Sequence, residues 1–310
     1  MLNNEKILIT GASGTLGAMM ARALAGENEV WGLARYADPV AVDTARHHGI
    51  MPVAVDLANP DFAAVPQDFT CLLHFAHTRL GGDAFPEAVR INAVGPGLLM
   101  QHLRGLKSAL VVSSTAVYTP PADVWHPLAE CDAIGGAFAP WAPTSPASKL
   151  SLEATAKLAA EAFSIPTVIA RLNTTYGPGR GPQGGLPVMD LEAVVRGDVV
   201  RTFADPYPHS PIHFDDMVDQ VEALLDAATI PATLVNWCGD EVVTQRRWCE
   251  LAGSFAGRVP DLQVHPMAGA PCGNVGDNRL RLALTGPCKR EFASAYRDIH
   301  AGMSAGDISA

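Results

Sequence analysis

Three glycines lie at a spacing of three between an apolar run and a helix-forming stretch. Gly11, Gly14 and Gly17 occupy this turn. A strand is predicted before it at Ile7–Ile9 and a helix after it at residues 18–24. A strand, a glycine-rich turn and a helix in this order bind nucleotide phosphates, because glycine permits the tight turn and lets the backbone approach a pyrophosphate. The free N–H groups at the start of the helix then face the anion.

The cysteines and histidines could also carry chemistry, as redox pairs or metal ligands. No Cys-x-x-Cys pair occurs, so we expect reduced thiols. The six cysteines are Cys71, Cys131, Cys238, Cys249, Cys272 and Cys288. Two histidine pairs have ligand-like spacing, His74 with His77 and His209 with His213. Neither pair has a convincing third or fourth ligand nearby, which a metal site needs, so we expect no metal.

Alternating strands and helices must position the glycine turn. Short apolar runs predict further strands at 30–35, 52–57, 71–76, 109–114 and 167–172. Helices are predicted at 85–103 and 147–163. Strands that alternate with helices indicate an α/β fold with a parallel, doubly wound sheet, whose ligands bind at the carboxyl ends of the strands.

Glycine and proline divide the chain into two parts. Residues 177–187 are too rich in both for regular structure and mark the point where the chain leaves the nucleotide domain. Residues 211–216 look like its return. The domains expected from this pattern are a nucleotide-binding domain over 1–176, joined again by 209–240, and a remainder over 177–310. That remainder comprises a small α+β substrate lobe, mostly 177–208 and 241–285, and a C-terminal helix.

Composition excludes several classes of protein. The chain has 310 residues, of which 48% are apolar and 17% charged, so it is globular and long enough for a large core. A net charge of −10 argues against nucleic acid or an anionic membrane as a partner. No apolar stretch approaches the roughly 20 residues that span a bilayer, and the first residues do not resemble a signal peptide. We therefore expect a cytoplasmic protein with a small-molecule substrate.

The glycine turn resembles that of the extended short-chain dehydrogenase/reductase family, which includes the sugar-nucleotide epimerases and dehydratases. Thr10 stands before the turn and Ala12-Ser13 inside it. Asp56-Leu57 resembles the pair that lies against the adenine in this family, and His74-Phe75-Ala76 resembles its His-x-Ala segment beside the cofactor. The resemblance implies an NAD(P)-binding Rossmann domain. It covers nearly the whole chain, although it is far weaker after residue 180.

The resemblance also assigns residues to the cofactor. Asn92 and Gly95 stand in the place of the family's Asn-x-x-Gly. The residues expected to contact NAD(P) are Gly11, Ser13, Gly14, Thr15, Leu16, Gly17, Arg35, Asp56, Leu57, Ala76, Asn92, Lys149 and Leu172.

The end of the second predicted strand selects the cofactor. An acidic residue there accepts hydrogen bonds from the ribose 2′-hydroxyl of NAD, whereas a basic one accommodates the 2′-phosphate of NADP. This chain has Arg35, and Asp38 comes three residues too late. Because an arginine–phosphate contact is charge-assisted, we expect NADP, with NAD as the alternative.

In the family, a Ser or Thr, a Tyr and a Lys do the chemistry. The tyrosine is the general acid/base on the substrate oxygen, the lysine lowers the phenol pKa from about 10 and holds the nicotinamide ribose, and the hydroxyl orients the substrate. By resemblance, Ser114 takes the place of the serine and Lys149 that of the lysine. The tyrosine belongs four residues before the lysine, where this chain has Ser145. The family's acid/base is therefore missing.

Ser145 has a structural interpretation. Thr144 or Ser145 can cap a helix whose first residue is Pro146, since proline is favoured there. Loss of a positioned acid/base typically costs about 10²–10⁴-fold in rate. Three alternatives follow: another residue supplies the proton, the reaction needs no strong acid, or the chain binds cofactor without turnover. Candidates for the other proton donor are Tyr118, Tyr176, Cys131, Glu130 and His126.

Two further departures from the family concern the substrate. Many sugar-nucleotide enzymes have an asparagine where this chain has Thr174, and an arginine where it has His209. Because those groups help to fix phosphates, the departures disfavour a nucleotide sugar. Dehydration is disfavoured as well, because the chain has Ala116 where dehydratases place an acidic pair.

We expect an atypical extended short-chain oxidoreductase that acts on a small carbonyl, hydroxyl or imine compound. Its expected catalytic residues are Ser114, Ser145 and Lys149. Two alternatives stay open: a non-catalytic NADP(H)-binding protein, and an epimerase or lyase that recycles its cofactor. In related proteins the helices that correspond to 85–104 and 147–163 form a four-helix bundle, so a homodimer is expected by analogy.

Overall fold

The computed structural model describes residues 2–136 and 139–306. These residues divide into two compact units. Unit 1 consists of the chain up to Val117, Trp141–Arg171 and Val218–Val235. Unit 2 consists of Tyr118–Pro140, Leu172–Met217 and the chain from Asn236 onward. Within the described residues, no helix is both long and apolar enough to cross a bilayer.

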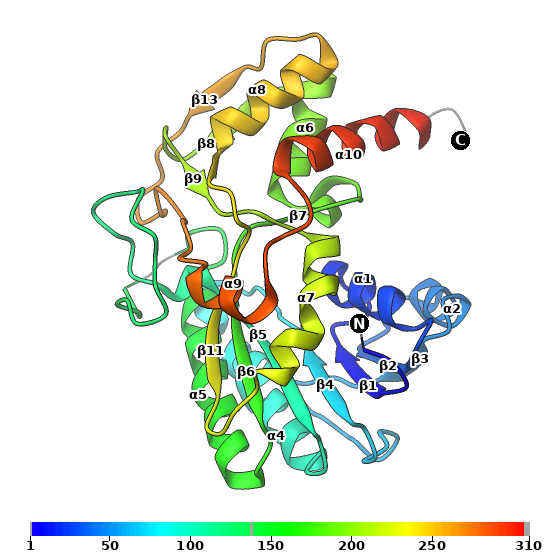
Figure 1. The fold of residues 1–310 in the computed structure, drawn as a ribbon. Coiled ribbons are helices and arrows are strands. Elements are labelled where there is room, and N and C mark those ends of the chain that lie inside the picture. The colour runs from blue at the N-terminus through cyan, green and yellow to red at the C-terminus, as the bar shows by residue number, and fades with distance from the viewer. Residues whose placement is uncertain (1, 137–138, 307–310) are drawn as a thin grey trace. The chain divides into compact units, whose positions relative to one another are not determined.

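A seven-stranded sheet forms the centre of unit 1, with the order β11-β6-β5-β4-β1-β2-β3 (Figure 1). Its strands are β1 (Lys6–Thr10), β2 (Glu29–Ala34), β3 (Met51–Ala54), β4 (Cys71–His74), β5 (Ser108–Ser114), β6 (Thr167–Leu172) and β11 (Thr233–Trp237). β1 pairs in parallel with β2 and β4, as β2 does with β3 and β4 with β5. The predicted doubly wound parallel sheet is confirmed.

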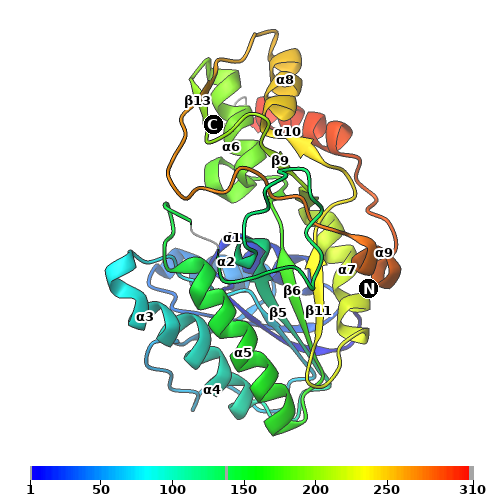
Figure 2. The same cartoon turned by 90° about the vertical axis from the view of Figure 1, so that its left-hand side faces the viewer.

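Helices cover both faces of this sheet. They are α1 (Thr15–Leu24), α2 (Pro39–His47), α3 (Phe85–Val89), α4 (Gly95–His102), α5 (Ser145–Phe163) and α7 (Phe214–Asp226). Short 3₁₀ turns lie at η1 (Gly82–Ala84) and η3 (Thr115–Val117). A π-helical segment, η2 (Arg90–Val94), joins α3 to α4. Figure 2 shows α4 and α5 side by side on one face of the sheet, and α1 and α2 lie on the other.

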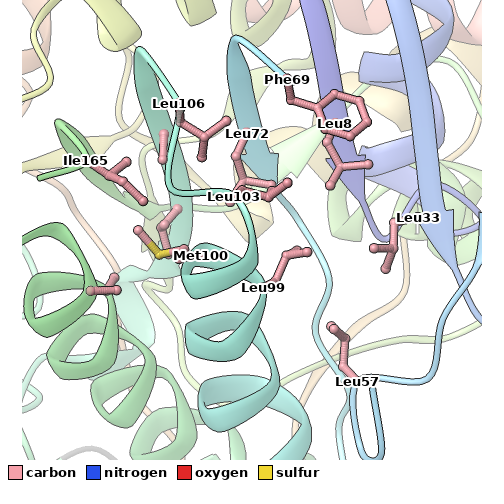
Figure 3. Close-up of a cluster of buried hydrophobic side chains, with 14 of the residues drawn as sticks. Leu8, Leu33, Leu57, Phe69, Leu72, Leu99, Met100, Leu103, Leu106 and Ile165 are labelled. Atoms are coloured by element: carbon pink, nitrogen blue, oxygen red, sulfur yellow. The ribbon is translucent and has the colours of Figure 1, made fainter. Parts of the chain in front are cut away.

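The core on the α4/α5 face explains why these helices dock there. Leu8 and Leu72 alternate with residues that point to the opposite face, so they meet the helices (Figure 3). Leu99 of α4 and Leu103, directly after that helix, take part in this contact (Figure 3). Leu152 of α5 belongs to the same core. Burial of one such leucine stabilises the fold by about 1.5–3 kcal/mol.

The strand order places the candidate site. From β1 the chain proceeds outward to β2 and β3, and β4 then returns to the opposite side of β1. Ligands of doubly wound sheets bind at such a reversal, beyond the carboxyl ends of the two strands. The glycine turn follows Thr10 at the end of β1, and the segment from Phe75 follows the end of β4.

Unit 2 has its own core and short two-stranded sheets, β10 with β7, β12 with β9, and β13 with β8. Its strands are β7 (Thr175–Tyr176), β8 (Val200–Thr202), β9 (Pro208–His209), β10 (Ile212–His213), β12 (Val243–Thr244) and β13 (Leu262–Val264). Its helical elements are η4 (Gly181–Gly184), α6 (Leu186–Arg196), α8 (Gln245–Ala256), α9 (Arg279–Thr285) and α10 (Phe292–Gly306). Tyr176, Trp248, Phe292 and Tyr296 are buried together in this core.

Several element boundaries differ from the sequence prediction. The strand predicted at 52–57 ends at Ala54, and the one predicted at 71–76 ends at His74. The single helix predicted at 85–103 contains the π-helical segment η2. Residues 177–187, expected to be irregular, include the 3₁₀ turn η4 and the first residues of α6. The short extent of β3 fits its place at the edge of the sheet, where only one neighbour holds it.

Candidate active site

The glycine turn is shaped as an anion cradle. Gly11 has φ +72, and its N–H donates to the carbonyl of Leu33 at 2.9 Å. The N–H of Gly14 donates back to the carbonyl of Gly11 at 2.8 Å. α1 begins at Thr15 with no side-chain cap, and Ser13 and Gly14 are exposed. The first N–H groups of the helix are therefore available to an anion, which fits the phosphates of a dinucleotide.

Gly17 allows α1 to pack on this turn. A Cβ at this position would lie 2.3 Å from the carbonyl oxygen of Gly11. We expect Gly17→Ala to destabilise the fold by about 1–3 kcal/mol, because the helix must move away from β1, and to weaken NADPH binding. Thermal unfolding and a fluorescence titration measure the two effects. Gly26→Ala is the control, because its Cβ meets nothing within 4 Å; equal behaviour of the two variants would contradict the prediction.

The end of β2 presents Arg35, which is exposed. Asp38 is used elsewhere, since its carboxylate accepts the N–H of Val40 at 2.9 Å and caps α2. Between them, Tyr36 has φ +45 and turns its ring back over the strand, so that a Cβ on Gly32 would lie 2.7 Å from its hydroxyl. Burial raises the pKa of Tyr36 to about 12. No sequence pattern indicated this tyrosine.

Four predicted cofactor residues lie at or just past the ends of strands β3, β4 and β6. Asp56 is exposed, and its side chain accepts the N–H of Ala58 at 3.0 Å, while Leu57 is buried. The N–H of Ala76 donates to the hydroxyl of Thr10 at 3.1 Å, so the segment after β4 is held beside the end of β1. Leu172 is buried as the last residue of β6 and belongs to unit 2.

Asn92 ties the segment after β4 to α5. Its Oδ1 accepts the N–H of Thr78 at 2.8 Å, and its Nδ2 donates to the carbonyl of Thr78 at 2.8 Å. The same Nδ2 donates to the hydroxyl of Ser148 at 3.2 Å. Asn92 lies in the π-helical segment and is buried. Its role in the structure is to hold two parts of the site together.

Lys149 is the buried cation of the site. Its side chain is 5% exposed, and Nζ donates to the carbonyl of Val112 at 2.6 Å. Burial lowers the pKa of Lys149 to about 7, while Glu153 raises it and Arg79 lowers it further. Glu153 lies one turn later on α5 and accepts hydrogen bonds from Arg171 and from Ser113, the latter at 2.6 Å.

Ser114 and Ser145 differ in their surroundings. Ser114 ends β5, is partly exposed, and its hydroxyl accepts the N–H of Ala116 at 3.1 Å. The expected cap by Thr144 or Ser145 is wrong. α5 begins at Ser145, and Thr144 makes no side-chain cap, because its hydroxyl bonds the backbone of Leu80. The hydroxyl of Ser145 instead lies 3.0 Å from Nε2 of His77.

From the sequence, His77 was considered only as a possible metal ligand, which was rejected, and its hydrogen bond to Ser145 was not predicted. No group of three or more metal-binding side chains occurs in the part of the chain that the structure describes. The sequence did contain a signal that His77 lies near a ligand: this histidine follows a strand at the reversal of the sheet, where ligands bind. Unit 1 therefore brings together His77, Ser145 and Lys149.

The other candidate proton donors belong to unit 2 and have contacts of their own. The hydroxyl of Tyr118 donates to the side chain of Asn236 at 2.6 Å, and Glu130 accepts the N–H of the same residue at 2.8 Å. His126 lies 2.9 Å from the carboxylate of Asp132. Tyr176 is buried in the core, which raises its pKa. Cys131 is exposed.

Thr174 and His209, the two residues at which this chain departs from many sugar-nucleotide enzymes, contact each other in unit 2. The hydroxyl of Thr174 lies 2.8 Å from Nδ1 of His209. His209 is buried, and this burial lowers its pKa to about 3, so the imidazole is neutral at physiological pH. Where the resembling enzymes place an amide and a guanidinium, this chain has a neutral pair without a cation.

The fold is that of a Rossmann-type α/β protein, and the shape of its glycine turn fits the phosphates of a dinucleotide. A model of the NAD dependent epimerase/dehydratase family matches residues 7–238, and the chain belongs to this family. No curated protein sequence matches it.

Solved structures share the fold at low identity. UDP-N-acetylglucosamine 4-epimerase from Methanobrevibacter ruminantium, in complex with UDP-N-acetylmuramic acid, is 17% identical over 98% of this chain and 100% of its own, with a TM-score of 0.82. A tyrosine-to-phenylalanine mutant of UDP-glucuronic acid 4-epimerase from Bacillus cereus, in complex with a fluorinated UDP-sugar and NAD, is 19% identical over 96% and 99%, with a TM-score of 0.81. UDP-glucose 4-epimerase from Thermotoga maritima, with UDP-glucose, is 16% identical over 96% and 99%, with a TM-score of 0.80. Identities this low show the fold alone.

Proposed function

We propose that this protein is an NAD(P)-dependent oxidoreductase of the extended short-chain dehydrogenase/reductase type, acting on a small carbonyl, hydroxyl or imine compound. The observation that carries the proposal is the placement of Lys149. A buried lysine whose pKa falls to about 7 is costly for stability, and such groups gather at functional sites. It stands on the first turns of α5 and bonds a carbonyl of β5, in the same unit as the anion cradle.

The residues of unit 1 would divide the work as follows. The N–H groups of the glycine turn would bind the pyrophosphate, and Lys149 would hold the nicotinamide ribose and polarise the site. Ser114 would hydrogen-bond the substrate oxygen, and Ser145 would stand where the family has its tyrosine. When bound, the nicotinamide would supply or accept the hydride.

Arg35 supports a preference for NADP. It is exposed at the end of β2, and the nearest acidic residue, Asp38, caps α2 instead. We expect Arg35→Ala to reduce the preference for NADPH over NADH by about tenfold, about 1.4 kcal/mol, because a charge-assisted phosphate contact is lost. Energy transfer from tryptophan to the reduced cofactor measures both affinities. Arg46→Ala, an exposed arginine of α2, should leave the ratio unchanged; an unchanged ratio in Arg35→Ala would mean that Arg35 does not contact the phosphate.

The neutral pair of Thr174 and His209 supports a substrate without a nucleotide diphosphate, because it offers no cation to the phosphates. A panel of small aldehydes, ketones and imines with NADPH tests the reaction through the absorbance of the reduced nicotinamide. Turnover of any member supports the proposal. Tight binding of NADPH without turnover of any panel compound or of the UDP-sugars tested below would favour a non-catalytic NADP(H)-binding protein. Ser145, in the place of the family's tyrosine, is the reason to consider that alternative.

A second candidate is an epimerase or lyase that recycles its cofactor, which the family membership and the fold of the UDP-sugar 4-epimerases favour. UDP-glucose and UDP-glucuronic acid are the probes. Product detected by NMR without a net change in nicotinamide absorbance would favour this candidate over the first.

A homodimer through α4 and α5 is part of the proposal, by analogy with related proteins. Leu158 of α5 is 68% exposed, which is compatible with an interface on that helix. Light scattering on the purified protein measures the oligomeric state, and a monomer would exclude the dimer.

A further inference from the structure

We propose that His77, acting through the hydroxyl of Ser145, moves the proton that the tyrosine moves in the resembling enzymes. The inference rests on the proposed function and names the acid/base which that function lacks. Its basis is the 3.0 Å hydrogen bond between Nε2 of His77 and Oγ of Ser145. The two residues are 68 positions apart in the sequence, so the fold has to bring them together.

Hydrogen bonds hold the segment that directly follows His77 in place. The residue after this histidine, Thr78, is bonded through its N–H and its carbonyl to Asn92. Leu80 is bonded through the same two backbone groups to the hydroxyl of Thr144, at 3.3 and 2.9 Å. Because Thr144 directly precedes Ser145, these bonds fix the segment of His77 against the start of α5. A proton relay needs donor and acceptor at hydrogen-bond distance before the substrate arrives, and this arrangement supplies it.

The second ring nitrogen indicates a ligand. Nδ1 of His77 is buried and has no hydrogen-bond partner among the described residues. If Ser145 donates to Nε2, the neutral ring carries its hydrogen on Nδ1 and offers it to an acceptor that the described chain does not provide. Buried polar groups without a partner are rare in native structures, so this one is suited to an oxygen of cofactor or substrate.

The charges around His77 keep it neutral. Burial lowers its pKa well below the ordinary value, and Lys149 on α5, Arg79 in the same segment and His74 at the end of β4 lower it further. His77 therefore meets the alcohol as a neutral ring with a free lone pair. The lowered pKa makes it a weak base, and the imidazolium formed in the reaction is a strong acid that returns its proton readily. The neutral and protonated forms of His77 therefore suit a proton carrier, which receives a proton in one half-reaction and gives it back in the other.

Oxidation of an alcohol by this relay needs no reactant besides the alcohol and the oxidised cofactor. In the oxidation of a secondary alcohol, the carbinol C–H bond breaks and the hydride passes to the oxidised nicotinamide, which is reduced. The alcohol proton passes to Oγ of Ser145, while the proton of Oγ passes to Nε2 of His77. A carbonyl and an imidazolium result. In the reverse direction hydride enters the carbonyl carbon, Ser145 protonates the oxygen, and His77 becomes neutral again.

Kinetics of matched variants test the relay. His77→Gln keeps a hydrogen-bonding group beside Ser145 but cannot take up the proton, and Ser145→Ala removes the link. We expect each to lower kcat for the NADP⁺-dependent oxidation of the alcohol that corresponds to the best carbonyl of the panel by about 10²–10⁴-fold, with an unchanged Kd for NADPH. His47→Gln, on the exposed side of α2, is the control. In the double variant H77A/S145Y, a phenol takes the space of the imidazole, and activity lost in His77→Ala should return. A His77→Gln variant as active as His47→Gln would overturn the proposal.

A measurement without turnover separates this proposal from the proposed function. ¹⁵N NMR of the histidine-labelled protein with NADP⁺ reports the protonation of His77 between pH 6 and pH 8. The proposal requires a neutral ring with its hydrogen on Nδ1 and an Nε2 signal that shifts in Ser145→Ala. An imidazolium at pH 7, or a hydrogen on Nε2, would overturn it. A wild-type protein that shows the required tautomer but turns over no carbonyl, imine or UDP-sugar probe would instead contradict the proposed function.

Discussion

Lys149→Met removes turnover, with an expected loss of at least about 10²–10⁴-fold in kcat on any carbonyl that the wild type reduces. Methionine fills a similar volume in the buried site but offers neither a charge nor a donor. It therefore loses the bond to Val112 and, with it, the proposed polarisation of the site and the proposed ribose contact. Initial rates of NADPH oxidation measure the effect. Lys157→Met, on an exposed side of the same helix, is the matched control and should retain full activity.

The pH dependence of cofactor binding gives an independent check. Because the pKa of Lys149 is lowered to about 7, the side chain is an ammonium below that pH and an amine above it. If the ammonium binds the cofactor, NADPH affinity weakens by about tenfold between pH 6 and pH 8 in the wild type. The Kd of Lys149→Met should be flat over the same range. A fully active Lys149→Met variant, or the same pH dependence in both proteins, would contradict the role of Lys149.

Glu153→Leu destabilises the protein by about 3–5 kcal/mol, because it leaves a buried guanidinium without its carboxylate. The side chain of Arg171 is 2% exposed, and it donates to both oxygens of Glu153, at 2.9 and 2.8 Å. The midpoint of urea unfolding measures the loss. The double variant Glu153→Leu/Arg171→Leu should lose less than the single variant, since the guanidinium is removed together with its carboxylate.

A surface pair provides the comparison for this prediction. Lys107 lies 3.1 Å from Glu5, and its side chain is exposed. Lys107→Met should change the free energy of unfolding by no more than about 1 kcal/mol. If Glu153→Leu and Lys107→Met were equally stable, the buried ion pair would not hold α5 to β6. Glu153 also supports the charge of Lys149, so its removal should lower the pKa of that lysine further.

Local signals in the sequence predicted the parts of the fold that local chemistry decides. The strand at 167–172 has the predicted bounds, because its middle, residues 168–170, is a buried apolar run. The glycine turn is recognisable because Gly11 and Gly17 fill positions that a side chain would disrupt. Arg35 lies directly after β2, as expected. These features depend on residues within one strand–turn–helix unit.

Long-range partners decided what the sequence did not predict. A serine before a proline is a good cap by local rules, but here a histidine from the segment after β4 lies against Ser145. Thr144, the other predicted cap, is engaged by the backbone of Leu80. The helix at 85–103 was predicted as continuous, although Pro96 cannot donate a backbone hydrogen bond inside it. In the π-helical segment before this proline, Asn92 bonds Thr78 after β4 and Ser148 on α5.

That π-helical segment fixes the rotational phase of the helix. In an α-helix each residue advances the side chains by about 100°, so removing one residue from Arg90–Val94 would turn everything on one side of the deletion by that angle. The shortened helix would have regular hydrogen bonds, yet Asn92 would no longer face both Thr78 and Ser148. An irregularity that costs local stability thus sets the angular alignment of the site, as is common for π-bulges. A regular α-helix over these residues would therefore position the site less well than the irregular helix that the chain has.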